Sequence, residues 1–85
     1  MNAVEDRIID IVKKISKNEK ISLETKLGRE EGIDSLGIVQ LIIEVEESFN
    51  INCDEYLIDI RNASNIKALC NIVCKMIEED KGPNG

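Results

Sequence analysis

The chain has 85 residues, which is room for one small domain and excludes a two-domain enzyme. Its 11 basic and 17 acidic residues give a net charge of −6, which disfavours binding to nucleic acid or anionic lipid and predicts partners with basic surfaces. Histidine is absent and aromatic residues make up only 2%, so catalytic and metal sites that need an imidazole are excluded and the core must be aliphatic.

The first segment predicts an amphipathic helix that starts near residue 3. Its apolar residues recur at spacings of four, three and four, with Val12 at the margin of the stripe: Val4, Ile8, Ile11 and Ile15. Asn2 and Glu5 resemble a capping box at its start. From about residue 18 to 33 the period is lost, which predicts a long loop with room for a short helical turn.

The stretch from Leu36 to Phe49 is the most apolar of the chain and predicts a central helix, with Asp34 as its N-cap. A narrow polar strip remains on this helix: Gly37, Gln40, Glu44, Glu47 and Ser48. Inside a helix, glycine is less stable than alanine by about 1 kcal/mol. Gly37 therefore suggests that a bound group or a partner approaches the helix closely at this position. The alternative is that the glycine has no functional role.

Two further helices complete the predicted fold. Residues 54–60 predict a short helix anchored by Tyr56, Leu57 and Ile60. Ser64 or Asn62 caps a last helix, whose apolar stripe we expect to be buried: Ile66, Leu69, Cys70, Val73 and Ile77. The prediction is an all-α fold, a small four-helix bundle with three longer helices, a short third helix and a long loop between the first two. We expect a single domain over residues 1–80 and a disordered tail over 81–85.

The three cysteines, Cys53, Cys70 and Cys74, form neither a CxxC pair nor an even disulfide set, which indicates reduced thiols. Cys70 lies on the apolar stripe of the last helix and Cys74 lies beside it, which indicates that both pack in the fold and are unreactive. We expect Cys53 to be more exposed. No stretch approaches the roughly 18 apolar residues of a membrane span, and the N-terminus does not resemble a secretion signal. We expect a soluble, cytoplasmic monomer with no membrane insertion.

Ser35 is the residue that points most clearly to chemistry. It follows the N-cap Asp34 at the first turn of the central helix, where unpaired N–H groups favour an anionic substituent. The dipeptide alone favours a simple helix cap over a modification site.

The residues around Ser35 resemble a known family. Gly32, Ile33, Asp34, Ser35 and Leu36, followed by apolar residues at helical spacing, look like the phosphopantetheine attachment site of acyl carrier proteins and related peptidyl and aryl carriers. The resemblance implies that Ser35 receives 4′-phosphopantetheine from coenzyme A, through a phosphopantetheinyl transferase that uses Mg²⁺. Asp34 would cap the helix and assist recognition, and Leu36 would pack beside the arm. Such a protein is not an enzyme. Partner enzymes load and process its acyl or aminoacyl groups as thioesters, in fatty-acid, polyketide or peptide biosynthesis.

The family also docks basic patches of its partner enzymes on this helix. The positions that correspond here are Val39, Gln40, Ile43, Glu44, Glu46 and Glu47. Gly37 and Gln40 stand where fatty-acid carriers commonly have acidic residues, and the run from Asp34 to Leu41 is similar to D-alanyl carrier proteins of teichoic acid modification. That alternative stays open. So do two of other classes: an acidic interaction module without a prosthetic group, and a thiol or metal protein built on Cys70 and Cys74, which no metal-ligand spacing supports.

Overall fold

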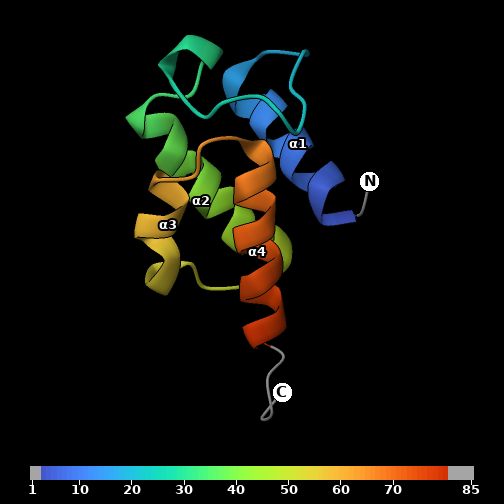
Figure 1. Cartoon of the computed structure of the whole chain (residues 1–85), viewed down its shortest axis with the longest axis vertical. Coiled ribbons are helices and arrows are strands. Elements are labelled where there is room, and N and C mark those ends of the chain that lie inside the picture. The colour runs from blue at the N-terminus through green and yellow to red at the C-terminus, as the bar shows by residue number, and fades with distance from the viewer. Residues whose placement is uncertain (1–2, 81–85) are drawn as a thin grey trace.

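The computed structural model describes residues 3–80 and confirms the small four-helix bundle (Figure 1). The elements in chain order are α1 (Ala3–Ser16), η1 (Arg29–Glu31), α2 (Ser35–Phe49), η2 (Asp54–Tyr56), α3 (Leu57–Arg61) and α4 (Ile66–Asp80). Here η denotes a single 3-10 turn. Within the described residues there is no strand, and the only β pairing is an isolated antiparallel bridge between Lys26 and Asn65. Asn2 and the predicted tail over 81–85 lie outside the described residues.

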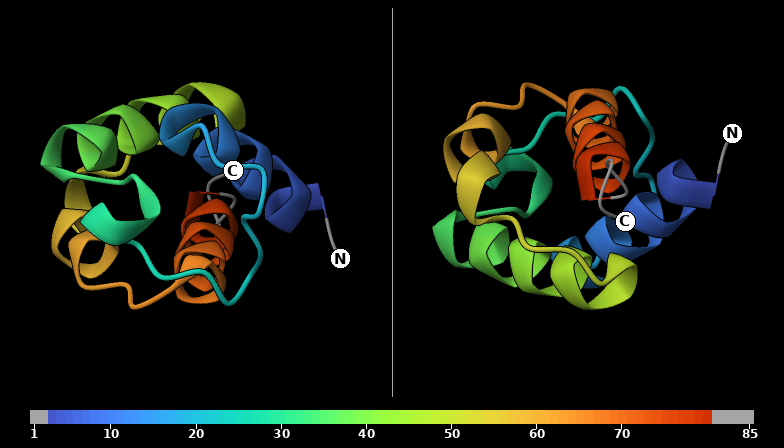
Figure 2. Two further views of the ribbon diagram at one scale, coloured as in Figure 1. Left: turned by 90° about the horizontal axis from the view of Figure 1, so that it is seen from above. Right: turned by 90° about the horizontal axis from the view of Figure 1, so that it is seen from below.

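Helix α1 lies against both α2 and α4, and the short α3 packs on α4 (Figure 2). This position explains why α1 buries more than the predicted stripe. Ile9 is buried beside Ile8 and Ile11, and Val12 is completely buried, so Val12 belongs to the core and not to its margin. A helix that packs against two other helices needs a wide apolar face. Apolar residues at alternating spacings of three and four describe only the narrow stripe of a helix that packs on one side.

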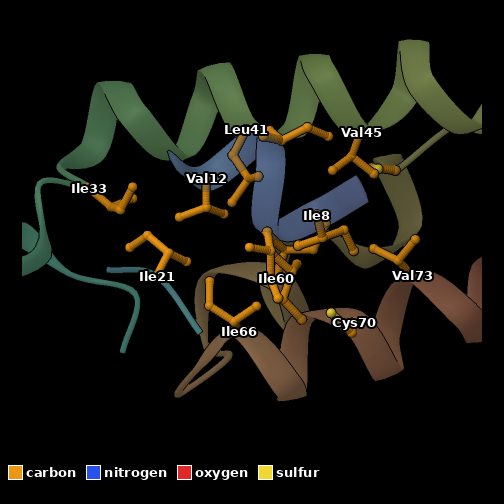
Figure 3. Close-up of a cluster of buried hydrophobic side chains, with 14 of the residues drawn as sticks. Ile8, Val12, Ile21, Ile33, Leu41, Val45, Ile60, Ile66, Cys70 and Val73 are labelled. Atoms are coloured by element: carbon orange, nitrogen blue, oxygen red, sulfur yellow. The ribbon is translucent and has the colours of Figure 1, made fainter. Parts of the chain in front are cut away.

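The core is aliphatic, as the composition predicts. Figure 3 shows side chains from α1, α2, α3 and α4 meeting with Ile21 and Ile33 of the long loop. Cys53, Cys70 and Met76 are buried in the same core. No buried side-chain nitrogen or oxygen among the described residues lacks a hydrogen-bond partner. A satisfied, close-packed interior of this kind holds the surface elements in fixed places.

The long loop is tied to the bundle by its backbone. The N–H groups of Ile66 and Lys67, at the start of α4, donate to the carbonyl oxygens of Thr25 and Leu23 at 2.9 and 2.8 Å. The first N–H groups of a helix have no partner within the helix, and here the loop supplies two of the acceptors. The loop between α1 and α2 therefore follows a defined path. The short helical turn for which the sequence leaves room is η1.

Three expectations for the last two helices are wrong. The cap of α4 is Asn65, whose Oδ1 accepts from the N–H of Ala68 at 2.9 Å, and not Ser64 or Asn62. Met76 is buried where Ile77 was expected, and Ile77 is only partly buried. In the short helix Ile60 is buried, but Leu57 is 39% exposed and does not anchor it in the core.

Candidate functional site

Helix α2 begins where the sequence predicts, and Ser35 is its first residue. The carboxylate oxygen Oδ1 of Asp34 accepts a hydrogen bond from the N–H of Gly37 at 2.8 Å, which confirms Asp34 as the N-cap. Ser35 itself is exposed. The cap thus presents the Ser35 hydroxyl to solvent at the positive end of a helix of 15 residues.

The residues before Asp34 hold this helix start in place. Ile33 is buried in the core, and its N–H donates to the carbonyl oxygen of Gly28 at 2.9 Å. Gly32 has φ +88°, and a Cβ there would lie 3.0 Å from the carbonyl oxygen of Ser16 at the end of α1. Glycine is required by both the backbone angle and the close approach. The loop therefore arrives at Ser35 through a rigid turn.

Gly37 is buried and does not belong to the polar strip that the periodicity suggests. A Cβ at this position would lie 3.5 Å from Cγ2 of Ile15 and 3.6 Å from Cγ2 of Ile33. The nearest atom to that Cβ would be Oδ1 of Asp34, at 3.4 Å. All of these are ordinary van der Waals distances, so packing within the fold leaves room for a methyl group and does not require a glycine here.

An open groove of about 710 Å³ adjoins Ser35 between the loop, α2 and α3. Its lining is mainly aliphatic: Leu27, Ile33, Ile38, Val39, Ile42, Ile43, Leu57 and Ile58. Ser35, Asp34, Arg29 and Arg61 supply the polar lining. Sequence reasoning missed this groove. No local signal in the sequence marks it, and only the structure shows that Ile58, a large apolar residue on its wall, is 76% exposed.

The predicted docking residues fall into two groups. Val39 and Ile43 are each about half exposed, and Gln40 and Glu47 are exposed, so these four are accessible on α2.

Leu36, which was predicted to pack beside the arm, is 65% exposed and does not line the groove.

The other two predicted docking residues have partners within the chain. The carboxylate of Glu44 pairs with the ammonium group of Lys14 on α1 at 2.7 Å. Oε2 of Glu46 accepts from the backbone N–H of Cys53 at 2.9 Å. Their negative charges are therefore already engaged, in part, inside the protein.

Cys53 is completely buried, so the expectation that it is exposed is wrong. The hydrogen bond from its N–H to Glu46 draws the chain after α2 inwards. Burial, together with the nearby charges of Glu46 and Asp54, raises the pKa of the Cys53 thiol to about 11. This thiol stays protonated at neutral pH, which makes it a poor nucleophile.

The site fits a phosphopantetheine group attached through an oxygen. The Ser35 hydroxyl is accessible, the start of α2 favours a phosphodiester, and the neighbouring groove offers apolar surface for an arm and its cargo. Within residues 3–80, no group of three or more cysteine or carboxylate side chains is arranged to hold a metal ion.

Comparison with known proteins agrees with this class. A family model described as a phosphopantetheine attachment site matches residues 6–73. The acyl carrier protein of Amoebophilus asiaticus is 33% identical over 75 residues, which cover 86% of this chain and 88% of that protein. The mitochondrial acyl carrier protein of Saccharomyces cerevisiae is 34% identical over 62 residues, or 66% of this chain. An acyl carrier protein of Phaeodactylum tricornutum is 42% identical over 36 residues, or 42% of this chain. No solved structure gave a significant match.

The chain spans about half the length of the yeast and Phaeodactylum proteins, with 50% and 47% of them covered. The fold and site are those of a phosphopantetheine-binding carrier, a class whose cofactor is covalently attached 4′-phosphopantetheine. Within that class, the chain belongs to the acyl carrier protein family. In the part of the chain that the structure describes, no helix is long and apolar enough to cross a membrane.

Proposed function

We propose that Ser35 is the attachment point of the phosphopantetheine arm and that the protein carries acyl groups on it for partner enzymes. The observation that supports this most strongly is the exposed hydroxyl at the capped start of α2, at the edge of an apolar groove. When bound, the arm supplies a thiol that holds an acyl group as a thioester. The names of the relatives favour acyl over aminoacyl cargo.

The chain's own residues have positioning roles in this proposal. Asp34 fixes where α2 begins, and Gly32 and Ile33 fix the direction from which the chain enters it. The aliphatic walls from α2 and α3 shield an apolar group from water, since each buried methylene group contributes about 0.8 kcal/mol. None of these residues performs catalysis. Their contribution is a high local concentration of the tethered group at a docked enzyme.

The partners in this proposal are a phosphopantetheinyl transferase and the enzymes that load and use the acyl group. We propose that they dock on the exposed face of α2, on Val39, Gln40, Ile43 and Glu47. The net charge of −6 would speed encounter with basic patches, although each exposed ion pair contributes little affinity. Glu44 would take part only if it leaves Lys14, and Glu46 mainly supports the fold.

The test of attachment uses purified apo protein, coenzyme A, Mg²⁺ and several phosphopantetheinyl transferases of broad specificity. Intact mass spectrometry should show the addition of one phosphopantetheine group to the wild type and none to Ser35→Ala. Ser48→Ala is the matched control, because Ser48 is an exposed serine on the same helix, and it should be modified like the wild type. A wild-type chain that remains unmodified with all of the transferases would contradict the proposal.

The cargo is identified by a loading experiment on the holo protein. The protein is offered to an acyl-loading transferase with malonyl coenzyme A, to a D-alanine-activating ligase and to amino-acid adenylating enzymes. We expect loading from the acyl donor and not from the amino-acid donors. Loading with D-alanine alone would replace the acyl assignment with the D-alanyl one.

A further inference from the structure

Two arginines line the groove beside Ser35. Arg29 is the first residue of η1, and Arg61 is the last residue of α3. Both are exposed, and neither forms an ion pair with any residue between 3 and 80. The chain has only one other arginine, Arg7 on α1, which is not part of the groove.

The arginines come from separate elements but meet at one site. Figure 1 shows α3 rising from the segment after α2 back towards the start of α2, and η1 near that same start. Arg29 of η1 and Arg61 of α3 both line the groove that Ser35 also lines.

The surroundings of Ser35 are otherwise acidic. Asp34 lines the same groove, η1 carries Glu30 and Glu31, and the net charge of the chain is −6. The N–H groups at the start of α2 offer a partial positive charge, but Asp34 already takes the N–H of Gly37. A phosphodiester on Ser35 would add one more negative charge here. Two guanidinium groups without ion-pair partners are the cations that could balance it.

We propose that Arg29 and Arg61 bind the phosphodiester on Ser35 and so direct the arm into the groove between α2 and α3. This inference rests on the proposed function. The guanidinium fork suits the task because it can donate two parallel hydrogen bonds to phosphate oxygens, which sets direction as well as charge. A bound phosphodiester restricts the first bonds of the arm and favours conformations along the apolar lining.

The experiment compares the arginine Nε–Hε signals of apo and holo protein by NMR. With three arginines in the chain, the signals are assigned by one Arg→Lys variant each. Attachment of the arm should shift the signals of Arg29 and Arg61 and slow their exchange with water, while the signal of Arg7 stays in place. The ³¹P signal of the holo protein should move in Arg29→Gln and Arg61→Gln and remain unchanged in the control Arg7→Gln.

Two results would overturn the inference. Signals of Arg29 and Arg61 that are the same in apo and holo protein would show that they do not bind the phosphodiester. Signals that move only after a carboxylated acyl group is loaded, and not after a neutral one, would assign the arginines to the cargo instead. Mass spectrometry of the same sample separates this failure from that of the proposed function, because a missing arm is a failure of attachment to Ser35.

Discussion

Asp34 is a single residue on which the position of Ser35 depends. Its side chain holds the first turn of α2 through the N–H of Gly37. We expect Asp34→Ala to lower the free energy of unfolding by about 1 kcal/mol, because the N-cap hydrogen bond is lost, and Asp34→Asn to retain most of it. Urea denaturation of the apo proteins measures both. Equal stability of Asp34→Ala and the wild type would contradict the role of Asp34 as a cap.

The thiols provide a second prediction at the scale of the residue. Burial raises the pKa of the Cys70 thiol to about 11, with Glu5 and Cys74 contributing, and Cys53 has a similarly raised pKa. Cys74 is only partly buried. In the folded apo protein at pH 8, iodoacetamide should therefore label Cys74 much faster than the other two, which should react only after unfolding. Rapid labelling of Cys53 would contradict its burial.

The same shifts predict how stability depends on pH. Both thiols have a higher pKa in the folded chain than the ordinary value of 9.0, so above pH 9 the unfolded chain binds fewer protons than the folded one. Stability should be unaffected by these groups below pH 9 and should fall as the pH rises from about 9 to about 11. Urea midpoints at pH 8 and pH 10.5 test the sign. A double variant, Cys53→Ala with Cys70→Ala, should show a smaller decrease between the two pH values.

At the scale of the element, Glu46 connects α2 to the segment that follows it. Its carboxylate accepts from the N–H of the buried Cys53, whereas the neighbouring Glu47 is exposed. We expect Glu46→Ala to lower the free energy of unfolding by about 1–3 kcal/mol, because it leaves a buried N–H without its acceptor. Glu47→Ala is the matched control and should change it by less than about 0.5 kcal/mol. Equal effects in the two variants would contradict the structural role of Glu46.

The positions of the helices could be predicted from the sequence, because apolar spacing and caps are local signals. The start of α2 at Asp34 and Ser35 is an example. The cap of α4 was misassigned although it is local, because Asn62, Ser64 and Asn65 are all residues that favour an N-cap, and only the structure shows that Asn65 accepts from the N–H of Ala68. The burial of Cys53 was missed because no local pattern marks the hydrogen bond between its backbone N–H and Glu46.

For the whole molecule, Ser35 and its cap could be predicted, but the groove beside them could not. The groove exists because α3 faces α2, and its residues are far apart in the sequence, from Leu27 to Arg61. Leu57 and Ile58 lie on its wall, so the short helix serves the site more than the core. The bundle thus combines a core built mainly from α1, α2 and α4 with an accessible apolar surface at the start of α2.

The most direct test of the account is peptide mapping of holo protein. Cleavage after arginine releases residues 30–61, which contain both Ser35 and Ser48. Fragmentation of this peptide should place a single phosphopantetheine on Ser35. A phosphopantetheine found on Ser48, or on any other residue while Ser35 is unmodified, would contradict the claim that the start of α2 is where the arm is attached.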